Sequence, residues 1–210
     1  NTERIDDVYN DLLKNTDICL DEVNQAFNNE KIKKAVGVDH LSNEMLKCSS
    51  PWIITYVHSF FKYLFNNGVF PDEWSTSIIV PVFKEGDSNT CSNYRPISLT
   101  SLVSKLYTHI LNTRLSLYVD YNNIISKEQI GYRKGFSPIE HVFTLYACVK
   151  KQFYKDRKLY AAFIDYKLCF DSVSREGLFH VLTNRGIDGK LYTAIKSMYR
   201  NVQACVRNND

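Results

Sequence analysis

The chain has no CxxC pair among its six cysteines and no histidine at zinc-finger spacing from them. We therefore interpret the cysteines as reduced thiols of an intracellular protein rather than as a disulfide framework. No stretch approaches the roughly 20 apolar residues of a membrane-spanning helix. The first residues, NTERIDDVYN, contain no apolar signal-peptide region. These absences argue against a small secreted scaffold and against a membrane protein.

Common motifs of nucleotide and metal chemistry are missing as well. The sequence contains no GxxxxGK[ST] and no GxGxxG, so neither glycine-rich phosphate loop is expected. The histidines are scattered, which gives a histidine-based metal or nucleophile site little support. They are His40, His58, His109, His141 and His180.

What is present is the composition of a globular protein. Of the 210 residues, 44% are hydrophobic and 23% are charged, which is enough to bury a core. The 26 Lys and Arg against 23 Asp and Glu give a net charge of +3, which permits a polyanionic partner without demonstrating one. Because the chain begins without Met, we expect a fragment of a longer protein.

Apolar periodicity and capping signals predict a helix-rich chain. The clearest helix has Ser50 as its N-cap, Pro51 at its first position and Gly68 past its end. Residues 1–17 are polar and weakly periodic, so we expect a loose lead-in there. The predicted helices lie in residues 20–36, 49–68, 99–119 and 137–156, and two more begin near Ser174 and Asp188, the first of them ended by Gly186.

Strand signals are fewer. Residues 77–83 (SIIVPVF) predict a strand, and Pro81 within it indicates an edge or bulge position. Residues 93–98 are predicted to be extended, residues 159–165 to form a second strand, and residues 202–208 to begin a third. Many helices and a small mixed or antiparallel sheet predict the α+β class.

The stretch LYAAFIDYKLCFDSV, residues 159–173, places Asp165 at the end of a predicted strand and Asp171 six residues later. Carboxylates at strand ends are suitable ligands for Mg²⁺, which prefers hard oxygen atoms and takes further ligands from substrate phosphates. The alternative is a strand-end acid followed by a helix cap, and for an isolated pair that alternative is favoured. The residues of this stretch alone leave both interpretations open.

Five blocks in order resemble the reverse transcriptases of LINE-type (non-LTR) retrotransposons. The block FIDYKLCFDSV is similar to the first catalytic motif of that family, and four upstream blocks are similar to its finger motifs. The resemblance runs from about residue 18 to the end of the chain. The upstream blocks are GVDHLSNEMLK (37–47), PDEWSTSIIVPVFKEGD (71–87), NYRPISLTSLVSKLYTHILNTRL (93–115) and EQIGYRKGFSPIEHVFTL (128–145).

The resemblance implies a set of roles around the first catalytic motif. Asp165 would be a catalytic aspartate that holds two Mg²⁺ ions, and the backbone carbonyl of Tyr166 would complete part of one metal shell. The backbone at Cys169 would lie close to the triphosphate. Phe170 would be the steric gate that clashes with a ribose 2′-OH, or else a core residue of the turn. Asp171 would be a helix cap or polar anchor at least as readily as a metal ligand.

Basic residues upstream receive roles from the same resemblance. Arg95 and Lys84 would lie in the fingers and face the incoming triphosphate. Arg133 and Lys134 would contact the template backbone. For each of them the alternative is a solvated surface charge.

The sequence departs from the family pattern in two respects. Leu168 and Cys169 replace the usual basic residue and alanine, so one charge is lost. The motif with the adjacent aspartate pair and the preceding Gln-Gly motif are both absent. Because a two-metal site then lacks most of its charge, we expect these 210 residues alone to be inactive.

The resemblance implies a partial right-hand polymerase, with residues 18–157 as fingers and residues 158–210 as the start of the palm. The implied partners of the full-length parent are an RNA template, a DNA primer and deoxynucleoside triphosphates, with no membrane. The implied location is the nucleus, with a cytoplasmic ribonucleoprotein stage. One alternative is a non-catalytic nucleic-acid-binding remnant. A phosphatase-like enzyme with Asp165 as nucleophile is a weaker one, because the usual DxD spacing is absent.

Overall fold

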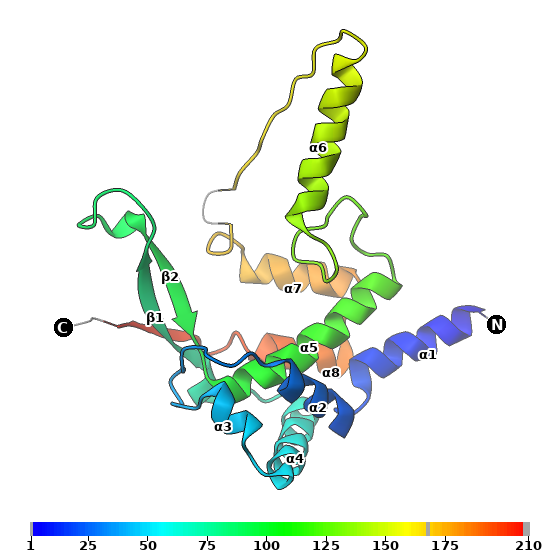
Figure 1. The fold of residues 1–210 in the computed structure, drawn as a ribbon. Helices are drawn as coiled ribbons and strands as arrows, with labels where there is room; N and C mark the ends of the chain where they lie inside the picture. The colour runs from blue at the N-terminus through cyan, green and yellow to red at the C-terminus, as the bar shows by residue number, and fades with distance from the viewer. Residues whose placement is uncertain (1, 167–168, 208–210) are drawn as a thin grey trace. The chain divides into compact units, whose positions relative to one another are not determined.

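A computed structural model describes residues 2–166 and 169–207 of the chain (Figure 1). The described chain divides into two compact units. Unit 1 comprises Asn1–Tyr118 and Phe179–Asp210, and unit 2 comprises Val119–Leu178. The predicted division falls after residue 157. The units instead meet after Tyr118, near the end of one helix, and after Leu178, within another. The assignment of fingers and palm stays a prediction.

Unit 1 is mainly helical, and most of its helices are those that the sequence predicts. The helix around Ser50 and Pro51 ends at Gly68, which has a φ of 61° and occupies the left-handed conformation that glycine tolerates at a helix end. The helices are α1 (Thr2–Asn15), α2 (Leu20–Asn29), α3 (Asn43–Lys47), α4 (Pro51–Asn67), α5 (Leu102–Tyr121), α7 (Arg175–Asn184) and α8 (Gly189–Ser197). The last residues of α5 and the first of α7 belong to unit 2.

The N-terminal segment is a helix and not the loose lead-in that its weak periodicity predicted. Polar contacts at the end of α1 anchor it to the start of α8. The Lys14 ammonium lies 2.7 Å from the Asp188 carboxylate, and Asn15 Oδ1 accepts a hydrogen bond of 3.0 Å from the backbone N–H of Lys190. Because these partners lie more than 170 residues away in the chain, local periodicity could not predict them.

The core of unit 1 lies where α2, α4, α5 and α8 meet. Phe61 and Tyr107 pack with ring centroids 5.2 Å apart, and Trp74 lies edge-on to Phe61 at 6.1 Å. Each fully buried large side chain stabilises the fold by about 1.5–3 kcal/mol. The buried residues of this core include Val23, Phe27, Phe61, Leu64, Phe65, Leu106, Tyr107, Ile110, Leu111 and Leu191.

A three-stranded mixed sheet completes unit 1. Its order is β2–β1–β3, in which β1 (Thr76–Phe83) pairs antiparallel with β2 (Tyr94–Leu99) and parallel with β3 (Gln203–Val206). The pairing with β3 ends at Ile79, so Pro81 has a partner on one side only. The predicted strand at residues 77–83, the extended residues 93–98, the strand that begins near residue 202 and the edge position of Pro81 are therefore confirmed.

The segment 159–165 was predicted to be a strand, and this prediction is wrong. Residues 159–166 have no regular secondary structure and pair with none of the strands in the described chain. Phe163 and Ile164 are exposed. A strand needs a neighbour to satisfy its backbone groups, and an apolar sequence alone does not supply one.

Unit 2 is built around α6 (Pro138–Phe153), which begins at the predicted capping signal. The Ser137 hydroxyl accepts a hydrogen bond of 3.3 Å from the N–H of Ile139, and the Glu140 carboxylate accepts one of 2.9 Å from the N–H of Ser137. This reciprocal arrangement fixes the first turn of the helix.

All six cysteines of the chain are free and exposed. None of the described helices is both long and apolar enough to cross a membrane.

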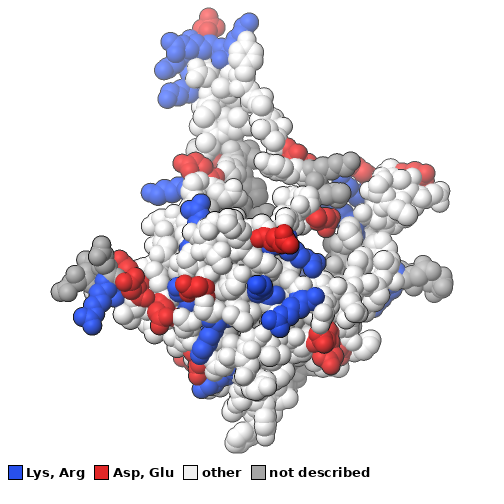
Figure 2. Space-filling view, turned by 180° about the vertical axis from the view of Figure 1, so that it is seen from behind, with Lys and Arg blue, Asp and Glu red and all other residues white. Residues whose placement is uncertain are grey.

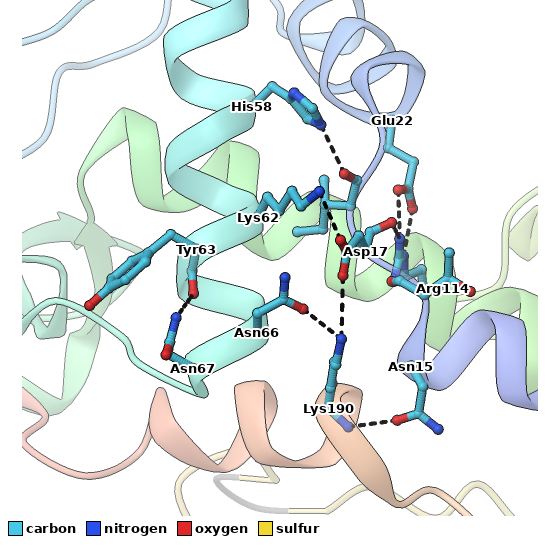
Figure 3. A network of polar contacts seen from close by, with 12 residues as sticks. Asn15, Asp17, Glu22, His58, Lys62, Tyr63, Asn66, Asn67, Arg114 and Lys190 are labelled. Atoms are coloured by element: carbon cyan, nitrogen blue, oxygen red, sulfur yellow. Dashed lines mark hydrogen bonds and ion pairs between the residues drawn. The ribbon is translucent and has the colours of Figure 1, made fainter.

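Asp17, in the link between α1 and α2, joins three parts of unit 1 (Figure 3). Its carboxylate lies 2.9 Å from the Lys62 ammonium on α4 and 3.3 Å from the Lys190 ammonium on α8. The hydrogen bond from Lys62 is the largest influence, followed by one from Asn66, and together they lower the pKa of Asp17 from its usual 3.8 to about 2. The charged form of this carboxylate is thus favoured in the folded state.

A pH dependence of stability follows from this pKa. A carboxylate with a lowered folded-state pKa stabilises the fold above its ordinary pKa, and the stabilisation is lost as pH falls. We expect the contribution of Asp17 to be complete above pH 3.8 and to disappear as pH approaches about 2. Urea unfolding at several pH values, compared between the wild type and Asp17→Asn, measures it. Identical pH profiles of the two proteins would contradict this expectation.

Candidate functional site

The β1–β2 hairpin brings Lys84 and Arg95 together. Arg95 pairs directly with Val82 across the hairpin, and the N–H of Lys84 donates a hydrogen bond of 2.8 Å to the carbonyl of Asn93. Directly paired residues share a face, as do residues two apart on one strand. Lys84 and Arg95 therefore lie on the same face of the hairpin, as a function shared by both residues requires.

Both cations are accessible on that face. Arg95 is exposed, and within the described ranges no ion pair involves it. The Lys84 ammonium lies 3.6 Å from the carboxylate of Glu85, and both side chains are largely exposed. An exposed pair of this kind contributes little to stability. Arg95 and Lys84 are thus both available to an anionic ligand.

Phe170 lies in a turn of residues 169–172 in unit 2. The carbonyl of Cys169 accepts a hydrogen bond of 3.1 Å from the Ser172 hydroxyl, which closes the turn. The Phe170 ring is 72% exposed and meets the ring of Tyr132 edge-on, with centroids 5.6 Å apart at 87°. The interpretation of Phe170 as a core residue of the turn is therefore wrong, because the ring faces solvent.

Tyr132 is a neighbour of Phe170 that was not predicted from the sequence. Tyr132 is 93% exposed and has a φ of 61°, which is uncommon for a residue with a side chain. Its position between Gly131 and Arg133 in the glycine-rich stretch GYRKG was a signal that could have indicated a special backbone conformation. Edge-to-face aromatic pairs favour a defined ring orientation, so Tyr132 restrains Phe170.

Arg133 and Lys134 differ in their surroundings. The Arg133 guanidinium binds the Asp120 carboxylate at 2.9 Å and lies 5.1 Å from the centre of the Phe136 ring. It also donates a hydrogen bond of 3.5 Å to the carbonyl of Ser126. These contacts give Arg133 a role in holding its own loop. Lys134 is exposed, and no ion pair within the described ranges involves it.

Asp165 lies in the exposed, irregular segment 159–166, next to Tyr166, which is also exposed. Asp171 is exposed in the turn that contains Phe170. Among the residues that the structure describes, no three His, Cys, Asp or Glu side chains come together as a metal site would require. Mg²⁺ prefers six oxygen ligands, so the donors present do not make up a two-ion site. Leu168, which departs from the family pattern, lies outside the described residues.

One comparison with known proteins is a match to a protein-family model. Residues 82–210 match the family model described as reverse transcriptase (RNA-dependent DNA polymerase). This range contains Lys84, Arg95, Arg133, Asp165 and Phe170.

Similar curated proteins come from transposable elements. A probable RNA-directed DNA polymerase from transposon BS of Drosophila melanogaster is 30% identical over 162 residues, which cover 77% of this chain and 18% of the relative. The RNA-directed DNA polymerase from mobile element jockey of the same species is 27% identical over 186 residues, 86% of this chain and 20% of the relative. The TX1 transposon uncharacterized 149 kDa protein of Xenopus laevis is 24% identical over 196 residues, 92% of this chain and 15% of the relative. The chain thus spans about a fifth or less of the length of these relatives.

Proposed function

The chain belongs to the reverse transcriptase (RNA-dependent DNA polymerase) family, and from this premise we propose that it is part of the RNA-directed DNA polymerase of a non-LTR retrotransposon. The observation that carries the proposal is the family match over residues 82–210, which includes the hairpin cations and the segment of Asp165. The names of the relatives, polymerases of the BS and jockey elements, support the retrotransposon origin. In the right-hand description of polymerases, the chain supplies the fingers and the first part of the palm.

In the parent protein, Asp165 contributes one carboxylate to a divalent-ion site with Mg²⁺ as the ion, and the remaining carboxylates come from elsewhere in the parent. The backbone carbonyl of Tyr166 is a further oxygen next to that carboxylate. Because a two-ion site needs more carboxylates than Asp165, we expect the isolated chain not to incorporate nucleotides.

Roles in binding the incoming nucleotide are assigned to the hairpin of unit 1 and, separately, to the turn of residues 169–172 of unit 2. Arg95 suits phosphate oxygens through paired guanidinium donors, and Lys84 adds a second positive charge on the same face. Phe170, restrained by Tyr132, excludes a ribose 2′-OH, and the backbone at Cys169 lies along the triphosphate. The substrates are thus deoxynucleoside triphosphates, with an RNA template that Lys134 contacts and a DNA primer. The product is made in the nucleus, after a cytoplasmic ribonucleoprotein stage.

RNA-templated primer extension by the full-length parent tests the proposal. We expect incorporation of deoxynucleotides on an RNA template, and a strong preference for them over ribonucleotides. Incorporation that needs no template, or none under any Mg²⁺ condition, would overturn the proposal. In that case the alternative holds, a nucleic-acid-binding remnant without polymerase activity.

The same assay tests the role of Phe170. Phe170→Val shortens the side chain, so a 2′-OH no longer meets the ring. We expect ribonucleotide incorporation relative to deoxynucleotide incorporation to rise by about one to two decades. Phe143→Val is the matched control, since it shortens another exposed phenylalanine of unit 2. An unchanged ratio of ribonucleotide to deoxynucleotide incorporation by Phe170→Val would contradict the role of Phe170 as a steric gate.

A further inference from the structure

The end of α6 and the turn after it carry an unusual concentration of positive charge. Residues 150–158, KKQFYKDRK, hold five cations and one acid, and we call this segment the basic tip. The rest of the chain has 21 cations against 22 acids. The positive net charge of the whole chain therefore comes entirely from these nine residues. Figure 2 shows Lys and Arg side chains gathered at the end of α6.

Hydrogen bonds fix the backbone of the basic tip. The N–H of Arg157 donates to the carbonyl of Gln152 at 3.0 Å, and the N–H of Asp156 donates to the carbonyl of Phe153 at 3.0 Å. Asp156 has a φ of 51°, so the helix ends in a Schellman motif with an aspartate in the left-handed position. The cations after the helix are therefore presented on an ordered turn.

Among the residues that the structure describes, the cations of the basic tip have no acidic partner. Within residues 2–166 and 169–207, no ion pair involves Lys150, Lys151, Lys155, Arg157 or Lys158. Attraction to the negative end of the helix dipole accounts for cations in the last turn of α6. It does not account for the three cations that follow the helix, since the effect falls off within one turn.

Aromatic rings are interleaved with these cations. Phe153, Tyr154 and Tyr160 are each between 77% and 86% exposed. Next to them, α6 and the returning chain line an open hollow of about 420 Å³. Its lining includes Leu145, Val149, Phe153, Arg157, Leu159 and Phe163. An apolar, partly aromatic hollow with a guanidinium in its wall suits a flat, uncharged ring next to a phosphate.

We propose that the basic tip, together with Tyr160 and the adjacent hollow, binds single-stranded polynucleotide. Cations that track phosphates and exposed rings on which bases stack are the two components of sequence-tolerant single-strand binding. Stacking requires unpaired bases, so a duplex fits this surface less well. The inference shares the nucleic-acid partner with the proposed function, but it concerns binding and does not depend on nucleotide incorporation.

Fluorescence anisotropy with the 210-residue chain tests the charge component. The probes are a labelled RNA of about 20 nucleotides, the DNA of the same sequence, and the duplex of that DNA. The tip variant is Lys155→Gln, Arg157→Gln and Lys158→Gln combined. Its control combines Lys31→Gln, Lys33→Gln and Lys34→Gln, which removes the same charge from exposed residues of unit 1.

We expect the tip variant to raise Kd for single strands about tenfold or more, and to lower the slope of log Kd against log salt by about 2, as loss of three phosphate contacts predicts. The control variant should change both quantities much less. Tighter binding to RNA would assign the basic tip to the template, and tighter binding to DNA to the primer or product. Equal losses in both variants, or preference for the duplex, would overturn the proposal.

An aromatic variant tests stacking separately. Tyr154→Ser combined with Tyr160→Ser leaves the net charge unchanged, so the salt slope should stay the same while Kd rises about 5- to 100-fold. Vesicles that contain phosphatidylserine are the counter-test, and tip-dependent binding to vesicles but not to oligonucleotides would contradict the proposal. A parent that binds single strands through the basic tip but fails to extend a primer would sink only the proposed polymerase function.

Discussion

Replacement of Asp165 by asparagine in the full-length parent is expected to lower the rate of RNA-templated primer extension by about three decades or more. The substitution keeps the size of the side chain and removes its negative charge. Because Asp165 is exposed in an irregular segment and makes no ion pair with the described residues, its loss should not affect folding. Single-turnover incorporation of one deoxynucleotide on an RNA template measures the effect.

Asp21→Asn is the matched control for this experiment. Asp21 is an exposed aspartate in the first turn of α2, and its substitution removes the same charge from unit 1. We expect extension by Asp21→Asn to equal that of the wild type. The helix-cap role predicted for Asp171 is wrong, because α7 begins at Arg175 and Ser174 accepts a hydrogen bond from the N–H of Gly177. Asp171→Asn separates the remaining roles, because a metal ligand would lower the rate and a polar anchor of the turn would not. Wild-type extension by Asp165→Asn would refute the role assigned to Asp165.

Replacement of Arg114 by methionine is expected to lower the free energy of unfolding by about 3 kcal/mol or more. Arg114 is 5% exposed, and its guanidinium binds both carboxylate oxygens of Glu22 at 2.6 and 2.7 Å. It also donates to the carbonyls of Thr16 and Asp17 and lies 4.9 Å from the centre of the Phe65 ring. Methionine fills the space but removes the guanidinium donor from Glu22 and from the two carbonyls.

The pKa of Glu22 depends on the same contacts with Arg114. Burial alone would raise it, but the hydrogen bonds from Arg114 and from the backbone of Cys19, with the charge of Arg114, hold the pKa below its ordinary value. Removal of the guanidinium leaves a partly buried carboxylate unpaired. Glu22→Gln added to Arg114→Met should therefore restore part of the lost stability, because the orphaned charge is removed.

Urea unfolding followed by tryptophan fluorescence measures this change in unit 1, since both Trp52 and Trp74 lie there. Lys62→Met is the control, because it breaks the more exposed pair with Asp17 and should cost no more than about 1 kcal/mol. Equal destabilisation by Arg114→Met and Lys62→Met would contradict the weight given to the buried network.

The sequence predicted elements whose signals are local. Ser50, Pro51 and Gly68 bound α4, and Ser137 with Glu140 begins α6, because caps and turns depend on neighbours within a few residues. The helix α1 could not be predicted in this way, because contacts with α8 anchor it across more than 170 residues.

The site shows the same division. The resemblance to the family singled out Lys84 and Arg95, and strand alternation places the two residues on one face of the hairpin. The prediction of a strand before Asp165 was wrong, because its residues pair with no strand in the described chain. The contacts of Phe170 with Tyr132 and of Arg133 with Asp120 depend on how loops fold back, and residue types alone do not specify this.

The pairing of Pro81 with Pro96 limits what the hairpin can join. Lys84 and Asn93 form a hydrogen-bonded pair, so alternation makes the two prolines a non-bonded pair, in which an N–H would point outward from each strand. The outer edges of β1 and β2 therefore each lack a backbone N–H at this pair of prolines, and the pairing of β1 with β3 ends before it. A strand of another chain could not pair continuously along either edge. The part of the hairpin beyond the pairing with β3 is therefore protected against edge-to-edge aggregation.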